Sequence, residues 1–160
     1  MSISRIISAL LGVGLIAHAH LAFSAEPVGT AETAPAGRLR IEVSNLHSDG
    51  GSVYCALYAE PGTGFPTDQS KAKASVKAVI KDRQSLCEFA DLGPGVYAVT
   101  VLHDENGNGK MDTDWMGIPK EGYGATRDAK GFMGPPKFKD AAFTYKGGAL
   151  TMQVRVKYGV

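Results

Sequence analysis

The sequence predicts an all-β domain folded as a two-sheet β-sandwich. About seven short segments carry strand patterns, turn residues separate them, and almost no stretch has helical periodicity. A chain of 160 residues has room for one domain, which we place at residues 38–160.

Residues 1–24 have the pattern of a secretory signal peptide. Arg5 precedes an apolar run over residues 6–16, and small residues follow. Cleavage after Ala19 or Ser24 fits this pattern, and Ser24 is favoured. The run is too short for a spanning helix, no later stretch is apolar enough for one, and no lipobox cysteine follows. We therefore expect a periplasmic or secreted protein that is not inserted into the membrane after signal cleavage.

Residues 25–37 are small and polar, contain prolines and show no periodicity, so we expect a disordered linker. Removing the leader takes one of the 17 Lys and Arg residues and none of the 16 Asp and Glu residues, which leaves a neutral chain. A neutral chain gives no electrostatic reason to expect nucleic acid or an anionic membrane as partner.

The first half of the domain predicts two hairpins. Residues 38–44 alternate polar and apolar, an Asp-Gly-Gly turn follows at 49–51, and residues 52–58 form the next strand. After a turn-rich stretch with one helical turn, residues 75–81 and 85–89 form the second hairpin around Asp82 and Arg83. Both hairpins present one apolar face to the core.

The second half predicts a central strand, a long loop and a last hairpin. A Gly-Pro-Gly turn starts a strand that is apolar on both faces up to Leu102, as in a strand covered on each side. Residues 116–139 are rich in Gly and Pro without periodicity and read as one long loop, which is usually functional or disordered. The last hairpin pairs residues 142–145 with residues 149–158 across two glycines.

Two cysteines, Cys55 and Cys87, lie on inward faces of their strands. In an oxidising compartment we expect a disulfide between them, which would stabilise the fold by about 3 to 4 kcal/mol. The alternative is a pair of buried free thiols.

The stretch after the central strand spaces oxygen-bearing side chains as a calcium loop does. The ligand positions one, three, five and nine of such a loop are occupied by Asp104, Asn106, Asn108 and Asp112. Gly109 at position six allows a sharp turn, and Lys110 at position seven supplies its carbonyl oxygen. Position twelve is Trp115 instead of Glu, so we expect the missing carboxylate from Asp114 or Glu121. With few charged ligands the dissociation constant would be on the order of 0.1 to 1 mM. The alternative is a series of Asx turns without metal.

Several motifs resemble the bacterial family DUF2141, a family of unknown function. They lie at residues 102–112 (LHDENGNGKMD), 117–124 (GIPKEGYG), 134–138 (GPPKF) and 140–143 (DAAF), and the resemblance spans residues 38–160. The turn at 91–97 also resembles that of transthyretin-like and carboxypeptidase-regulatory sandwiches, which implies an immunoglobulin-like arrangement of strands.

We expect an exported binding module in which calcium holds the loop 104–114 and so orders residues 116–139. Aromatic residues in 115–139 would then form a recognition surface for a protein, glycan or small molecule: Trp115, Tyr123, Phe132 and Phe138. The alternatives are an aromatic lid without ligand, an accessory envelope protein, and a hydrolase that uses His103 beside Asp104 and Glu121. No nucleophile elbow, Cys-His pair or zinc motif supports the hydrolase.

Overall fold

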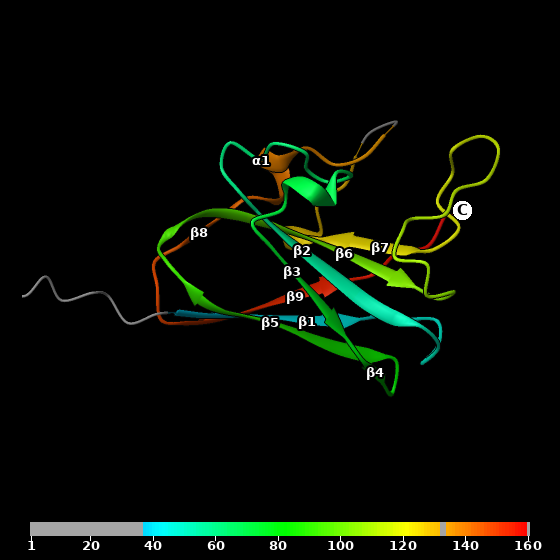
Figure 1. Ribbon diagram of the computed structural model, residues 1–160, viewed down its shortest axis with the longest axis horizontal. Helices are drawn as coiled ribbons and strands as arrows, with labels where there is room; N and C mark the ends of the chain where they lie inside the picture. Colours follow the sequence, from blue (N-terminus) through cyan, green and yellow to red (C-terminus); the bar gives the residue numbers. More distant parts are fainter. Residues whose placement is uncertain (1–36, 132–133, 160) are drawn as a thin grey trace, which may run out of the picture. The chain divides into compact units, whose positions relative to one another are not determined.

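The computed structural model describes residues 37–131 and 134–159 (Figure 1). The predicted signal peptide and residues 25–36 of the predicted linker lie outside the described residues. The first strand begins at Gly37, one residue earlier than predicted. In these two ranges, no helix combines the length and the apolar character needed to cross a membrane.

Two sheets form the domain, as predicted. Sheet A contains, in spatial order, β4 (Ile80–Lys81), β5 (Gln84–Leu92), β1 (Gly37–Ser44) and β9 (Ala149–Arg155). Sheet B contains β3 (Ala74–Ala78), β2 (Ser52–Ala59), β6 (Gly95–Asp104) and β7 (Gly122–Ala125), with β8 (Phe143–Tyr145) paired to the first part of β6. The prediction of an all-β two-sheet sandwich is confirmed, whereas its immunoglobulin-like strand arrangement stays a prediction.

The core lies between the inward faces of the two sheets. Its largest fully buried aliphatic residues alternate along their strands as the pattern predicted: Leu39, Ile41, Val43, Val53, Leu57, Val99, Val101 and Val154. Strand β6 is buried on both faces over most of its length and pairs with β2, β7 and β8. The central strand that leads into the candidate loop is therefore confirmed.

The predicted hairpin of the first two strands is wrong. Strand β1 lies in sheet A, antiparallel to β5 and parallel to β9, while β2 lies in sheet B. The last predicted hairpin is also wrong, because β8 pairs with β6 and β9 pairs with β1. Strands that face each other across a core show the same alternation as neighbouring strands, so the pattern could not separate the two cases.

The second predicted hairpin is half correct. Strand β4 does pair with β5 across the turn at Asp82 and Arg83, both of which have positive φ. Strand β3, however, pairs with β2 in sheet B. The chain changes sheets at Val79, whose side chain is 84% exposed.

The prediction that residues 116–139 form one long irregular loop is wrong. They contain β7, the 3-10 turn η2 (Thr126–Asp128) and the start of the short helix α1 (Phe138–Ala141). The turn η2 and the helix α1 help to cover the outer face of sheet B, where Phe65 packs edge-on against Tyr58 and Phe138 at centroid distances of 5.3 and 5.8 Å. The Thr126 hydroxyl fixes this layer, because it accepts from Val99 N–H and donates to the Ala141 carbonyl.

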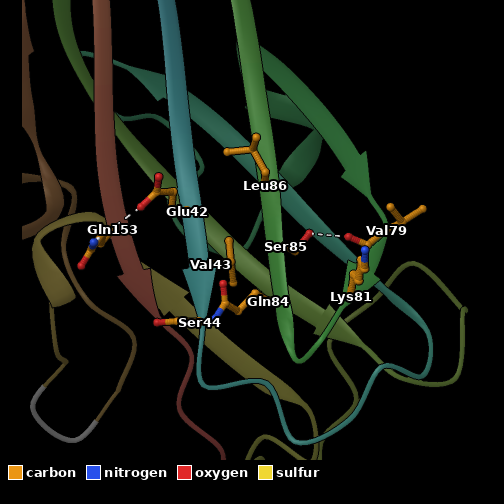
Figure 2. A pocket seen from close by; sticks show the side chains of 9 residues that line it. All are labelled: Glu42, Val43, Ser44, Val79, Lys81, Gln84, Ser85, Leu86 and Gln153. Carbon is orange, nitrogen blue, oxygen red and sulfur yellow. Dashed lines mark hydrogen bonds between the residues drawn. The ribbon is translucent and has the colours of Figure 1, made fainter.

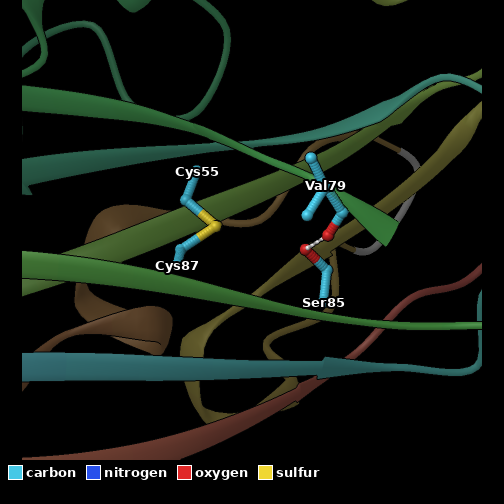
Figure 3. The surroundings of a disulfide bond; sticks show 4 residues. All are labelled: Cys55, Val79, Ser85 and Cys87. Carbon is cyan, nitrogen blue, oxygen red and sulfur yellow. Dashed lines mark hydrogen bonds between the residues drawn. A yellow bond between two sulfur atoms is a disulfide. The ribbon is translucent and has the colours of Figure 1, made fainter. Parts of the chain in front are cut away.

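The disulfide between Cys55 and Cys87 is present and joins the sheets (Figure 3). Cys55 lies on β2 and Cys87 on β5, with 6.3 Å between their Cα atoms and both side chains fully buried. The bond therefore crosses the middle of the core instead of linking strands of one sheet.

Replacing both cysteines with alanine should lower the free energy of unfolding by about 3 to 4 kcal/mol, because the bond closes a loop of 32 residues in the unfolded chain. Urea denaturation of the oxidised protein and of the variant measures this difference. The reduced wild-type protein serves as control and should match the variant closely. Equal stability of the oxidised protein and the variant would contradict the prediction.

The Tyr58 hydroxyl is buried without a hydrogen bond of standard geometry. Burial raises the pKa of this phenol, and the nearby Thr100 side chain partly offsets the effect. Tyr58→Phe should raise the free energy of unfolding by about 1 kcal/mol, since it removes an unsatisfied polar group. Tyr145→Phe is the matched control and should destabilise, because the Tyr145 hydroxyl donates to the Gly148 carbonyl. A destabilised Tyr58→Phe protein would show that Tyr58 has a partner in solution.

Candidate functional site

Strand β6 delivers His103 and Asp104 to the end of sheet B, where both side chains are fully buried. Asp104 pairs with Ser52 of β2, and His103 pairs with Gly122 of β7. The loop that follows therefore starts from a backbone held on both sides.

The Asp104 carboxylate is the centre of the loop. Its Oδ1 accepts from the backbone N–H groups of Gly107 (2.8 Å) and Asn108 (3.1 Å), and its Oδ2 accepts from Gly109 (2.7 Å). Gly107 and Gly109 have φ angles of 78° and 76°, which residues with a side chain rarely adopt. The glycines thus allow the backbone to wrap around a buried negative charge, and charge-assisted hydrogen bonds stabilise it.

Two asparagines connect this centre to Asp112. The Asn106 Oδ1 accepts from Asn108 N–H (3.0 Å), and the Asn108 Oδ1 accepts from Lys110 N–H (2.8 Å). Their Nδ2 groups both donate to the Asp112 carboxylate, at 2.5 Å from Asn106 and at 3.0 and 3.1 Å from Asn108. Four predicted ligand side chains therefore lie in one hydrogen-bonded network: Asp104, Asn106, Asn108 and Asp112.

Glu121 braces the loop from the opposite side. This residue directly precedes β7 and its side chain is buried. Its Oε1 accepts from Glu105 N–H (3.2 Å) and its Oε2 accepts from Asp112 N–H (3.0 Å). One carboxylate thus ties the beginning of the loop to its end.

Asp114 lies apart from this network. Its Oδ1 accepts from the N–H groups of Met116 (2.8 Å) and Ile118 (2.9 Å) and so closes the next turn. Of the two carboxylates predicted to complete the ligand set, Glu121 is joined to the loop and Asp114 is not.

The loop is closed by its own hydrogen bonds. Within the described ranges, no three His, Cys, Asp or Glu side chains are grouped as a metal cluster. The Asx hydrogen bonds of Asn106 and Asn108 are those expected for the metal-free alternative. What the geometry provides is a set of oxygen groups at short range, with the amides of both asparagines turned toward Asp112.

His103 occupies a structural position. Its Nε2 lies 2.9 Å from the Gly50 carbonyl oxygen, which can only accept, so Nε2 carries the proton and Nδ1 accepts from the Tyr158 hydroxyl at 2.6 Å. The Tyr158 oxygen in turn accepts from His47 N–H (2.8 Å), and the rings of Tyr158 and His47 stack. Burial raises the pKa of Tyr158, and the hydrogen bond from the His47 backbone opposes this effect. With both nitrogens engaged and the ring buried, the geometry gives the hydrolase alternative no support.

Sequence reasoning missed both partners of His103. Tyr158 lies 55 residues from His103 and Gly50 lies 53 residues away. In the sequence, Tyr158 continues the alternation of Val154 and Val156 with polar residues, and this spacing is the signal that predicts an inward side chain. It could not indicate which residue the hydroxyl meets.

Three of the four aromatic residues of the predicted recognition surface are described, and their surroundings differ. Trp115 is 91% exposed, Tyr123 is half-buried on β7, and Phe138, the first residue of α1, packs against Phe65. Phe132 lies outside the described residues. Trp115 and its neighbour Met116, which is 59% exposed, are left as an apolar pair at the tip of a turn.

A shallow depression on sheet A lies elsewhere in the fold (Figure 2). Residues of β1, β4, β5 and β9 line it, and the lining includes the charged side chains Glu42 and Lys81. Gln153 donates to Glu42 across it at 3.5 Å. Unlike the loop 104–112, this open surface has a single carboxylate in its lining, that of Glu42.

Replacing Asp104 with asparagine should lower the free energy of unfolding by about 1 to 3 kcal/mol in metal-free buffer, because an amide nitrogen cannot accept the N–H groups that now meet a carboxylate oxygen. Urea denaturation in EDTA measures the change. Glu105→Gln is the matched control, since that side chain is exposed and adjacent, and it should have little effect. A wild-type midpoint for Asp104→Asn would contradict the role of this carboxylate.

A family model covers most of the residues of this site. The family model described as "Uncharacterized protein conserved in bacteria (DUF2141)" matches residues 41–153. This range includes the loop, its brace Glu121 and parts of both sheets, and it covers more than half of the 160 residues. No curated protein and no solved structure matches the chain. The chain belongs to the DUF2141 family.

Proposed function

We propose that the protein is an exported, non-enzymatic β-sandwich module with a weak structural calcium site in the loop 104–114. The observation that carries the proposal is the convergence of the Asp104 and Asp112 carboxylates with two asparagine amides in one network. Carboxylate, amide and carbonyl oxygens are the ligands that Ca²⁺ prefers.

The two asparagines are the groups that would change on binding. In the metal-free loop their nitrogens donate to Asp112, in the place where a cation would neutralise that carboxylate. A half-turn of each amide exchanges nitrogen for oxygen and turns two donors into two ligands. Asp104 and Asp112 then supply negative charge, the Lys110 carbonyl supplies a neutral oxygen, and Glu121 keeps the ends of the loop together.

The low charge of this ligand set determines the expected affinity. Two carboxylates and two amides bind more weakly than the acidic set of a high-affinity site, so the dissociation constant stays on the order of 0.1 to 1 mM. A site of this strength is occupied where calcium is millimolar, outside the cytoplasm. This agrees with the predicted export of the chain.

The proposal that the module binds a partner rests on different residues from the proposal of a calcium site. The partner class that we expect is a protein, glycan or small molecule, and an accessory envelope protein without ligand is the alternative. The exposed pair Trp115 and Met116 favours a binding role, because a large apolar tip contributes nothing to the core.

Calcium should raise the Tm of the mature, disulfide-intact protein, and the rise should continue with the logarithm of the calcium concentration above the dissociation constant. At 10 mM calcium the stabilisation by mass action is about 1.4 to 2.7 kcal/mol for the stated range of dissociation constants. That corresponds to a rise in Tm of roughly 5 to 10 °C. Thermal unfolding in EDTA and across a calcium titration measures it, with magnesium as the control ion. No calcium-specific rise would leave the loop as a series of Asx turns and overturn the proposal.

Matched variants test which side chains act. Asp112→Asn should abolish the calcium response, whereas Asp114→Asn should keep it, because Asp114 closes a separate turn. The double variant Asn106→Asp/Asn108→Asp should have a lower Tm in EDTA, since three carboxylates then meet without donors between them. The same variant should show a larger rise with calcium. A parallel change in both conditions would show that the asparagines are not ligands.

A further inference from the structure

The turn at residues 112–120 presents its two tip residues to solvent. Lys120 N–H donates to the Asp112 carbonyl (2.8 Å), Asp114 N–H donates to the Ile118 carbonyl (2.9 Å), and Thr113 and Pro119 form a bridge between them. These bonds close a short antiparallel ladder with Trp115 and Met116 at its tip. The tip is therefore held by backbone hydrogen bonds although its two side chains are largely exposed.

Three of the four N–H groups of residues 115–118 are bonded within the turn. The N–H groups of Met116 and Ile118 donate to the Asp114 carboxylate, and Gly117 N–H donates to the Asp114 carbonyl (3.0 Å). These three bonds lower the cost of moving the tip out of water, because unpaired polar groups are what makes transfer to an apolar medium expensive. The turn also offers few free donors for pairing with a strand of another protein.

The charged residues of this region lie outside the tip itself. Residues 115–119 carry no charge, while Lys110 and Lys120 are exposed behind them. Five acidic side chains lie in the same region against these two lysines, a net charge of −3 for residues 104–121: Asp104, Glu105, Asp112, Asp114 and Glu121. One Ca²⁺ in the loop brings this net charge to −1.

We propose that the Trp115–Met116 tip docks in the headgroup region of a phospholipid bilayer, and that calcium in the loop permits this on anionic membranes. Tryptophan favours the membrane–water interface, where its ring meets both apolar and polar groups. The bonded tip backbone favours a bilayer over a protein partner that pairs with a strand. The calcium dependence rests on the proposed function, whereas the docking of the tip rests on its exposure and hydrogen bonding.

Trp115 is the only tryptophan of the chain, so its fluorescence reports the tip directly. Vesicles of phosphatidylcholine, with and without phosphatidylglycerol, should shift its emission to shorter wavelength. On the anionic vesicles, calcium should lower the lipid concentration for half-maximal shift by about tenfold to thirtyfold, since each charge near such a surface is worth about 1 kcal/mol. The calcium-dependent Tm, measured without lipid, reports the metal site separately.

Vesicle co-sedimentation compares the variants. Trp115→Ala should abolish sedimentation and keep the calcium-dependent rise in Tm, because its side chain is no ligand. Val79→Ala is the matched control, an exposed apolar residue between β3 and β4 whose loss should change nothing. Trp115→Ala sedimenting like the wild type, or an unshifted emission on both vesicle types, would overturn the docking and direct the search to a protein partner. Docking with equal lipid dependence in EDTA and calcium would overturn the calcium link alone.

Discussion

The buried carboxylate of Asp104 is the constraint on which the candidate site depends. A carboxylate without solvent contact is costly unless donors surround it, and here three backbone N–H groups of one loop supply them. The need to surround this carboxylate with donors therefore determines the path of the loop backbone. Glycines at 107 and 109 are required because the wrap passes through positive φ twice.

The polar side chains near this end of the sandwich each make a different structural contact. Glu121 closes the loop, Asp114 closes the next turn, and His103 with Tyr158 joins the end of β6 to the C-terminal segment. Each buried side chain has partners that account for it, so an acid–base role would have to break a structural contact. Asp112 differs, because its partners are two amides that can rotate.

The proposed calcium-bound state would differ from the metal-free loop mainly in the two amides. Amide donors stabilise a carboxylate by hydrogen bonds, whereas a divalent cation would neutralise it and would need the amide oxygens. The proposed site would be weak, since calcium would have to replace hydrogen bonds that already stabilise the loop. The conformation of the 112–120 turn depends on the same Asp112 backbone that Glu121 holds, which links the tip to the loop.

The sequence by itself determined most of the strands, the turn residues, the inward faces of both cysteines and the order of oxygen groups after β6, but not strand β7. These are local properties, because alternation, positive φ and ligand spacing are read within a few residues. The tertiary structure decided the rest. It placed β1 and β2 in different sheets, made β9 the parallel neighbour of β1, and selected Glu121 rather than Asp114 as the brace of the loop. Pairing between distant strands depends on which faces meet across the core, and this information does not lie in any one segment of the chain.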